Sequence, residues 1–343
     1  MKIIVDMMGG DNAPLAVLEG AAAAVKEYGV QLIGVGDEAL VRKTAADNNI
    51  SLDGIELVNC TEVIEMCDEP ARAIRTKKDS SIVVGLNMLK EGKGDAFVSA
   101  GSTGALLSGA TLVVKRIRGI RRAAMGPQIP TAGGRAVLCD CGANAECTPE
   151  YLLQFAYLGS YYAQRVMGIE KPRVGLLNIG TEPSKGMELQ KAAHALLTQA
   201  HEAGRIRFVG NIEGREAISQ GAADVLVTDG FTGNIFLKTV EGAASLFSHA
   251  LKDMLLGSTK NKLAALLLKN SIGAFKKRFD ANEVGGTALL GISQPVIKAH
   301  GSSNAYAFFN AIRQAQVVAQ ADIVGDIAAN VAHMRLEPGE KEG

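Results

Sequence analysis

The sequence has no tryptophan, and aromatic residues make up only 5% of its 343 residues. It has no excess charge either: the formal net charge is zero, so no global field attracts nucleic acid, and we expect no nucleic-acid partner. Cysteine is sparse and odd in number, at five, and the start Met1–Asp6 does not look like a signal peptide. We therefore expect a reducing, cytoplasmic setting rather than a disulfide framework.

Long hydrophobic runs are also scarce. One uncharged stretch, Ala96–Val114, is long enough to span a bilayer, but it contains five Ser or Thr residues and three glycines. This polarity favours a strand, a loop and a helix over a membrane span. The group Cys139, Cys141 and Cys147 matches no zinc template, and Cys139 lies in an apolar segment, so we predict structural cysteines and no metal.

Short apolar segments alternate with longer helical patterns, which is typical of an α/β fold with a mostly parallel sheet flanked by helices. We predict a single catalytic domain over residues 1–336, which includes a helical hairpin at 239–280, and a flexible tail at 337–343. The expected strands are Lys2–Asp6, Gln31–Val35, Ile55–Asn59, Ala96–Ala100, Arg135–Asp140, Arg173–Asn178, Arg207–Val209 and Val225–Asp229. The expected helices include Pro14–Tyr28, Glu150–Met167, Lys185–Ala203 and Ala305–Ala319.

Glycine is abundant, at 39 residues, and it gathers in small polar loops that follow five of these strands. In open α/β sheets ligands bind outside the carboxyl ends of the strands, so the five loops should converge on one crevice. Backbone N–H groups and helix N-termini would make this crevice suit an anion, phosphate above all. Neither dinucleotide nor Walker fingerprints follow the first strand, and no nucleotide or other cofactor is expected.

The loops also carry a family resemblance. The segments Val5–Pro14, Ser99–Ala105, Asp140–Asn144, Asn178–Gly180, Gly210–Arg215, Asp229–Asn234, Gly285–Gly291 and Ala299–Ser303 occur in order along the chain. Together they resemble the motifs of the bacterial phosphate acyltransferases of phospholipid synthesis, which transfer a fatty acyl group from acyl carrier protein to inorganic phosphate. The resemblance covers almost the whole chain.

This resemblance implies a fold similar to phosphotransacetylases and isocitrate dehydrogenases, with a protruding helical hairpin. It implies a homodimeric enzyme whose acyl phosphate product serves a downstream membrane glycerol-3-phosphate acyltransferase. The reaction needs no triad and no metal, because phosphate is already an anion and a thiolate is a fair leaving group. The site must instead align phosphate with the thioester and stabilise the oxyanion.

Three residues are our first candidates for catalysis. Lys185, expected at a helix start, would supply a cation, and Asn234 would donate to phosphate or carbonyl while also being a candidate helix N-cap. His300, in a Gly/Ser-rich loop, would protonate the thiolate or donate a hydrogen bond, unless it is simply a surface histidine. Further candidates for the substrate-binding loops are Gly10, Asp11, Asn12, Gly101, Ser102, Thr103, Gly104, Asn144 and Gly233. Asp6, Asp140 and Asp229 are predicted to anchor loops, since carboxylates would repel phosphate.

The segment 249–280 combines leucines with seven Lys or Arg residues against two aspartates. A hairpin with apolar faces and a basic rim suits dimer packing, an anionic membrane surface or the acidic carrier protein. We expect membrane or dimer contact through Leu263, Leu266 and Leu267, and therefore a cytoplasmic protein with peripheral membrane association.

Two other functions are compatible with the sequence. The first is a phosphotransacetylase that acts on a short acyl-coenzyme A, which would release coenzyme A but not a carrier protein. The second is a non-catalytic membrane scaffold for lipid-synthesis enzymes, which would leave the glycine loops unexplained.

Overall fold

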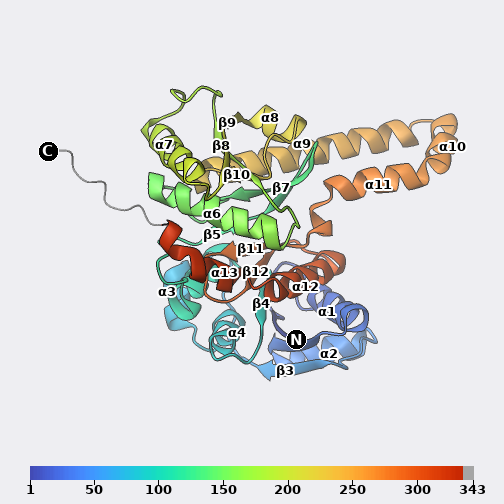
Figure 1. Cartoon of the computed structure of the whole chain (residues 1–343). Helices are drawn as coiled ribbons and strands as arrows, with labels where there is room; N and C mark the ends of the chain where they lie inside the picture. Colours follow the sequence, from blue (N-terminus) through green and yellow to red (C-terminus); the bar gives the residue numbers. More distant parts are fainter. Residues whose placement is uncertain (335–343) are drawn as a thin grey trace.

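The computed structural model describes residues 1–334, and the predicted tail at 337–343 lies outside the described residues. Strands and helices alternate through most of it (Figure 1). The strands are β1 (Lys2–Asp6), β2 (Gln31–Gly36), β3 (Ile55–Asn59), β4 (Ala96–Ser99), β5 (Ala124–Gly126), β6 (Gln128–Thr131), β7 (Gly134–Cys139), β8 (Arg173–Asn178), β9 (Arg207–Glu213), β10 (Val225–Val227), β11 (Gly286–Leu290) and β12 (Val296–Ala299). All eight predicted strands are present.

The helices begin with α1 (Leu15–Tyr28), α2 (Glu38–Asp47), α3 (Pro70–Thr76), α4 (Ser81–Lys90) and α5 (Thr103–Gly109), which continues into η1 (Ala110–Val114). The middle of the chain forms α6 (Pro149–Arg165), α7 (Glu188–Glu202) and α8 (Gly214–Ser219). The rest forms α9 (Gly230–Leu256), α10 (Thr259–Leu267), α11 (Lys269–Phe279), η2 (Ala281–Glu283), α12 (Ala305–Gln320), α13 (Ile323–Asn330) and η3 (Val331–Met334).

The strands form two sheets. The first has the order β3-β2-β1-β4-β12-β11-β5, and the second has the order β6-β7-β10-β8-β9. Most neighbours are parallel, as predicted, whereas β5, β6 and β11 supply the antiparallel pairs. All four strands that the sequence did not predict, β5, β6, β11 and β12, lie in these antiparallel pairs, and β12 also pairs in parallel with β4.

The chain returns to the first sheet at its end, and the two sheets share a core. Strand β12 pairs in parallel with β4, so that Ile297 lies beside Val98. Helix α12 packs against α1 and against β4, β11 and β12. One continuous set of buried side chains runs from Ile3 in the first sheet through Tyr162 in α6 to Val225 in the second sheet. The loops at the strand ends of both sheets are thereby held in fixed relation.

An arm projects from this body (Figure 1). It consists of the outer part of α9 together with α10 and α11, and neither α10 nor α11 has a buried residue. The turn between α9 and α10 is capped by Ser258, whose Oγ accepts from the N–H of Asn261 at 3.1 Å. The arm agrees with the predicted hairpin, although its long helix begins already at Gly230; the assignment of domain boundaries stays a prediction.

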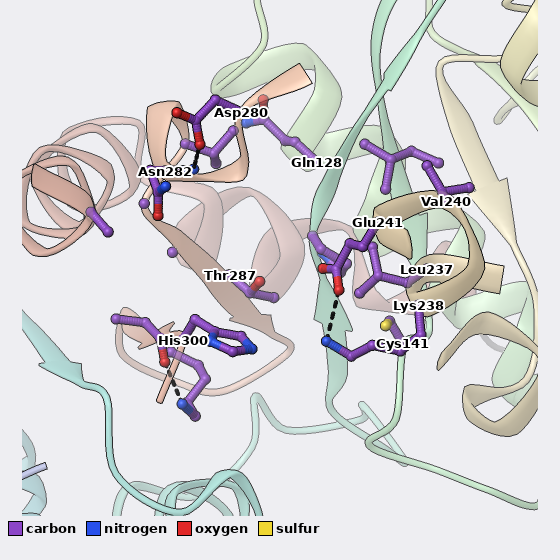
Figure 2. Close-up of a pocket in the computed structure, with 18 of the residues that line it drawn as sticks. Gln128, Cys141, Leu237, Lys238, Val240, Glu241, Asp280, Asn282, Thr287 and His300 are labelled. Atoms are coloured by element: carbon purple, nitrogen blue, oxygen red, sulfur yellow. Dashed lines mark hydrogen bonds and ion pairs between the residues drawn. The ribbon is translucent and has the colours of Figure 1, made fainter. Parts of the chain in front are cut away.

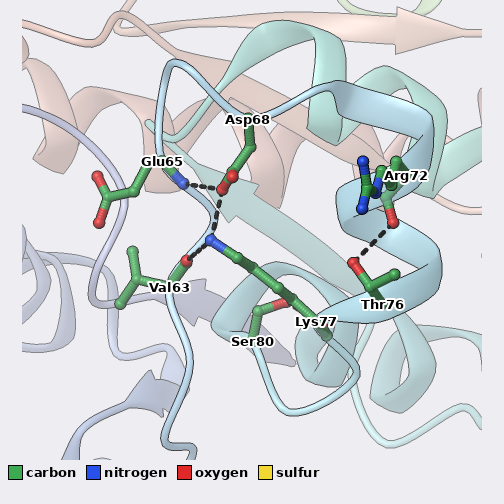
Figure 3. A network of polar contacts seen from close by, with 7 residues as sticks. All are labelled: Val63, Glu65, Asp68, Arg72, Thr76, Lys77 and Ser80. Carbon is green, nitrogen blue, oxygen red and sulfur yellow. Dashed lines mark hydrogen bonds and ion pairs between the residues drawn. The ribbon is translucent and has the colours of Figure 1, made fainter.

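A polar network fixes the loop that precedes α3 (Figure 3). Lys77 Nζ donates to the carbonyl of Val63 at 2.9 Å and to the carboxylate of Asp68, which also accepts from the N–H of Glu65 at 2.8 Å. The ion pair lowers the pKa of Asp68 and raises that of Lys77. Met66 lies within this loop, so the network fixes the backbone position from which its side chain extends.

The packing of α1 on α12 gives a test of the fold. A Cβ on Gly20 would lie 2.6 Å from the carbonyl oxygen of Ala305 and 2.9 Å from the nitrogen of Phe309, so Gly20→Ala should cost about 1–3 kcal/mol of unfolding free energy. Gly242 in α9 has open space around the same position, and Gly242→Ala should stabilise by up to about 1 kcal/mol. Denaturant unfolding of both variants measures the contrast. Equal effects would contradict the close approach of the two helices.

Candidate active site

A cavity of about 870 Å³ opens at the strand ends of both sheets. Its walls come from β6 and β7 of the second sheet, from β11 and β12 of the first, and from α9 and α11 (Figure 2). Of the predicted catalytic residues, Asn234 and His300 line it, and so does Thr103. The chain segments that follow β4, β7, β10 and β12 therefore converge, with Asn234 contributed by helix α9 rather than by a loop. Of the five loops that the sequence predicted to converge, those after β1 and β8 supply no residue to the wall.

The loop after β1 supports this cavity from behind. The N–H of Asp11 donates to the carbonyl of Gly301 at 2.8 Å, and Asn12 Nδ2 donates to the carbonyls of Ser302 and Ser303 at 3.3 and 3.2 Å. Gly10 has φ of +103°, a conformation that favours glycine. Gly10, Asp11 and Asn12 thus position the His300–Ser303 loop, and none of these three residues is in the cavity wall.

A buried carboxylate holds the loop after β4. Asp6 accepts from Ser99 Oγ at 2.6 Å and from the N–H of Met8 at 3.0 Å, and Ser99 Oγ accepts in turn from the N–H of Gly101 at 3.0 Å. Burial raises the pKa of Asp6, while these hydrogen bonds oppose the rise. Ser102 caps α5 through its Oγ, which leaves Thr103 at the cavity wall.

A second buried carboxylate holds the loop after β7. Asp140 accepts from the N–H groups of Met125, Cys141 and Asn144 at 2.6–2.8 Å, and burial raises its pKa. The amide of Asn144 donates to Asp140 at 3.0 Å and to the carbonyl of Ala123 at 2.8 Å. Asn144 thus braces the loop and does not reach the cavity wall.

Asn234 is not the N-cap of its helix, so of the two roles that the sequence left open, donor and N-cap, only that of donor stays a prediction. Helix α9 already begins at Gly230, and Asp229 caps it by accepting from the N–H of Thr232 at 2.8 Å. Asn234 therefore lies in the second turn, where its amide is close to Gly142 and faces the cavity. Gly233 serves packing: a Cβ there would lie 2.0 Å from the carbonyl oxygen of Asp140.

His300 and Ser303 place polar atoms at the first-sheet side of the cavity. Nδ1 of His300 accepts from the N–H of Ser302 at 3.2 Å and contacts the Oγ of that residue at 2.8 Å. A proton would then reside on Nε2, which has no bond within the described part of the chain. Ser303 Oγ is buried and has no hydrogen-bond partner among residues 1–334, which marks a position for a polar ligand group.

Lys185 lies apart from this cavity. Helix α7 begins at Glu188, so the expected helix start at Lys185 is wrong, and the residue belongs to an exposed loop after β8. The carbonyl of Lys185 accepts from Asn178 Nδ2 at 3.1 Å, and its N–H donates to the carbonyl of Glu182 at 3.0 Å. The structure does not bring Lys185 together with Asn234 and His300 in the cavity wall. Gly104 also lies outside that wall, next to Pro70.

The structure supplies a different cation, Lys298, which the sequence reasoning missed. Lys298 is the single charged residue of β12, lines the cavity and is only 7% exposed. Its Nζ donates to the carbonyls of Ala100 at 3.3 Å and of Ala299. Burial lowers the pKa of Lys298 to about 8, while the charges of Asp6 and Asp11 oppose that fall. The sequence did contain a signal for this residue, a lone lysine within the apolar segment Val296–Ala299.

The three cysteines considered for a metal are structural in geometry. Cys139 and Cys141 are buried, and burial raises the pKa of Cys141 and of Cys147 to about 12. Within residues 1–334, no three His, Cys, Asp or Glu side chains gather as metal ligands would. Across the same residues, every helix falls short of the length and apolar character that a bilayer crossing demands.

This fold is that of the phosphotransacetylases. The phosphotransacetylase of Streptococcus pyogenes superposes with a TM-score of 0.63 and 19% identity, covering 92% of this chain and 94% of that one. A phosphotransacetylase from Staphylococcus aureus gives 0.61 and 20%, over 93% and 94% of the two chains. A putative 4-hydroxythreonine-4-phosphate dehydrogenase from Salmonella typhimurium gives 0.52 at 15% identity, with 94% and 99% covered.

The sequence comparisons define the family within this fold. The model of a family described as "Fatty acid synthesis protein" matches residues 1–325. A phosphate acyltransferase of Staphylococcus aureus is 48% identical over 326 residues, which are 94% of this chain and 96% of that protein. The chain therefore belongs to this family of fatty acid synthesis proteins, as a phosphate acyltransferase.

The buried lysine predicts a pH-dependent stability. The folded pKa of about 8 lies below the ordinary value of 10.5, so the folded state binds fewer protons than the unfolded state between these values, and stability rises with pH there. From about pH 7 to about pH 10, the wild type should gain roughly 1–3 kcal/mol of unfolding free energy relative to Lys298→Met. Urea unfolding at both pH values checks this. A constant difference would show that Lys298 is not desolvated.

Proposed function

We propose that this acyltransferase transfers a long-chain fatty acyl group from acyl carrier protein to inorganic phosphate and releases acyl phosphate. One observation carries the proposal: a single cavity combines a buried cation, a buried hydroxyl that has no hydrogen-bond partner within residues 1–334, and an apolar wall. Lys298 and Ser303 provide the polar end. The apolar wall continues along α9 and includes Leu237, Val240 and Ala244.

The transfer needs little covalent chemistry from the protein. An oxygen of hydrogen phosphate forms a bond to the thioester carbon, the carbonyl oxygen carries negative charge in the tetrahedral intermediate, and the carbon–sulfur bond then breaks. The departing thiolate takes a proton from solvent, while the hydrogen phosphate gives up its own proton as the acyl phosphate forms. The N–H at Nε2 of His300 donates a hydrogen bond to the sulfur as it leaves. Lys298 and the amide of Asn234 bind the phosphate and the developing oxyanion, where a water-poor site strengthens their effect.

The arm supports the cellular part of the proposal. Leu263, Leu266 and Leu267 are 62%, 67% and 81% exposed on α10, and the same helix carries Lys260 and Lys262. Such a surface fits peripheral contact with an anionic membrane, where a membrane glycerol-3-phosphate acyltransferase would consume the product. Leu246 and Phe247 on α9, about 70% exposed, suit burial by a second copy in a homodimer.

The rival function, a phosphotransacetylase for short acyl-coenzyme A, has the same fold. The extended apolar wall distinguishes the two proposals, because a short acyl group would leave much of it in contact with water. A non-catalytic scaffold would need neither the buried ammonium group of Lys298 nor the hydroxyl of Ser303 in the cavity wall.

The reaction is tested with long-chain acyl-acyl carrier protein, with and without inorganic phosphate, by following release of the carrier thiol and the acyl phosphate product. Asn234→Ala should lower kcat/KM about 100- to 1,000-fold, the range for loss of one oxyanion donor, and Asn330→Ala on α13 is its control. Lys185→Ala, with Lys191→Ala as control, tests the lysine predicted from sequence. Release without phosphate, or only from short acyl-coenzyme A, would refute the assignment.

Membrane contact predicts that the protein floats with vesicles rich in phosphatidylglycerol and that salt weakens the association by screening the lysines. Leu266→Glu should abolish most of it, because a charge would enter the interface. Leu40→Glu, at a 39% exposed leucine on α2, should leave flotation unchanged. Equal flotation of both variants would exclude α10 as the contact.

A further inference from the structure

A second, smaller cavity of about 420 Å³ adjoins the candidate active site. Gln128, Arg135 and Val284 line both cavities, so the two are neighbours around the ends of β6 and β7. The smaller cavity also collects charge, since Lys277, Arg278 and Arg313 lie in its wall. We call this group of Arg135, Lys277, Arg278 and Arg313 the basic vestibule.

The basic vestibule has more positive charge than its own acid can neutralise. Glu283 is the acidic residue of the cavity wall, and its carboxylate accepts from the hydroxyl of Tyr306 at 2.9 Å. Within residues 1–334, no carboxylate oxygen lies within 4.0 Å of a side-chain nitrogen of Arg135, Arg313 or Lys277.

Some of these cations are already engaged with backbone. Arg278 donates to the carbonyls of Thr131 and Ala132, both at 2.9 Å, and Arg313 donates to the carbonyl of Glu283. These bonds fix two guanidinium groups without neutralising them. The guanidinium of Arg135 has no hydrogen-bond partner among the described residues. Burial lowers its pKa, and so does the charge of Arg313, while the charges of Glu283 and Asp280 oppose the fall. An anion between Arg135 and Arg313 would favour the charged form of both groups and so oppose the effects of burial and of their mutual repulsion.

We propose that the basic vestibule binds the phosphate of the pantetheine arm of the acyl donor, an inference that rests on the proposed function. A guanidinium group can donate two parallel hydrogen bonds to the oxygens of one phosphate. Arg135 lies on strand β7 and Arg313 on helix α12, so both side chains extend from rigid elements. The thioester would lie near Lys298 in the larger cavity, and the arm would pass Gln128 and Val284 to reach the vestibule.

The protein would then bind phosphate at two places with different functions, which the sequence alone could not distinguish. Inorganic phosphate, the nucleophile, needs to lie beside the thioester carbon, at the Lys298 and Asn234 end. The phosphate of the donor is chemically inert in the reaction and serves only to position the arm. Its site should therefore affect binding of the donor, and thus KM, more than the rate of the bound complex.

The test compares two small donors that differ only in this group: dodecanoyl-pantetheine and dodecanoyl-4′-phosphopantetheine. The wild type should use the phosphorylated donor with the higher kcat/KM. Arg313→Gln should lower kcat/KM for that donor about tenfold or more, through KM, and should thereby remove most of its advantage over dodecanoyl-pantetheine. Arg313→Lys should restore part of the advantage, and Arg42→Gln, an exposed arginine paired with Glu38 on α2, should retain all of it.

Other outcomes would overturn the assignment. Equal use of both donors by the wild type would do so, and so would a rise in KM for inorganic phosphate that is the same with either donor. Thermal unfolding checks that Arg313→Gln is folded, and Arg135→Gln repeats the measurement if it is not. Absence of acyl phosphate from both donors and from acyl-acyl carrier protein would refute the proposed function itself, an outcome distinct from equal use.

Discussion

The geometry of this site depends on two carboxylates that are buried at the ends of strands. Asp6 accepts from the N–H of Met8 in the loop after its own strand and from the hydroxyl of Ser99 at the end of β4. Asp140 accepts from the N–H groups of Cys141 and Asn144 in the loop after its own strand. Burying a carboxylate is costly unless several donors surround it, and here the loop backbone supplies most of them. The loops are therefore held in one conformation by the need to solvate a charge, which leaves Thr103 and Gly142 free to face the cavity.

The same constraint explains the position of Lys298. Its ammonium group is surrounded by backbone carbonyl oxygens and the field of Asp6 and Asp11, with no direct ion pair among the described residues. Such a cation is only partly neutralised, and it retains the capacity to attract a further anion. A lysine in a full salt bridge would hold phosphate less strongly, since its charge would already be compensated.

The sequence predicted the parallel strands and the loops behind them because each buried strand is a short apolar run that ends in glycine and polar residues. It predicted less where neighbours far along the chain decide the structure. Strands β5 and β6 are three and four residues long and become strands only by pairing with β11 and β7.

Lys185 and Lys298 show the same limit for the site. Which lysine faces the cavity depends on the return of β12 to β4, a contact between residues about 200 positions apart. The vestibule was missed for that reason too, as Arg135 and Arg313 meet only in the folded chain.

Helix α9 has a further consequence through its length. Its first turn packs tightly on the loop after β7, while its far end reaches the tip of the arm, so 27 residues separate the two by about 40 Å. That is several Debye lengths at physiological ionic strength, where the screening distance is about 8 Å. Charges at the tip are thus screened from the first turn of α9, and the two ends of one helix can lie in opposite electrical environments without disturbing each other.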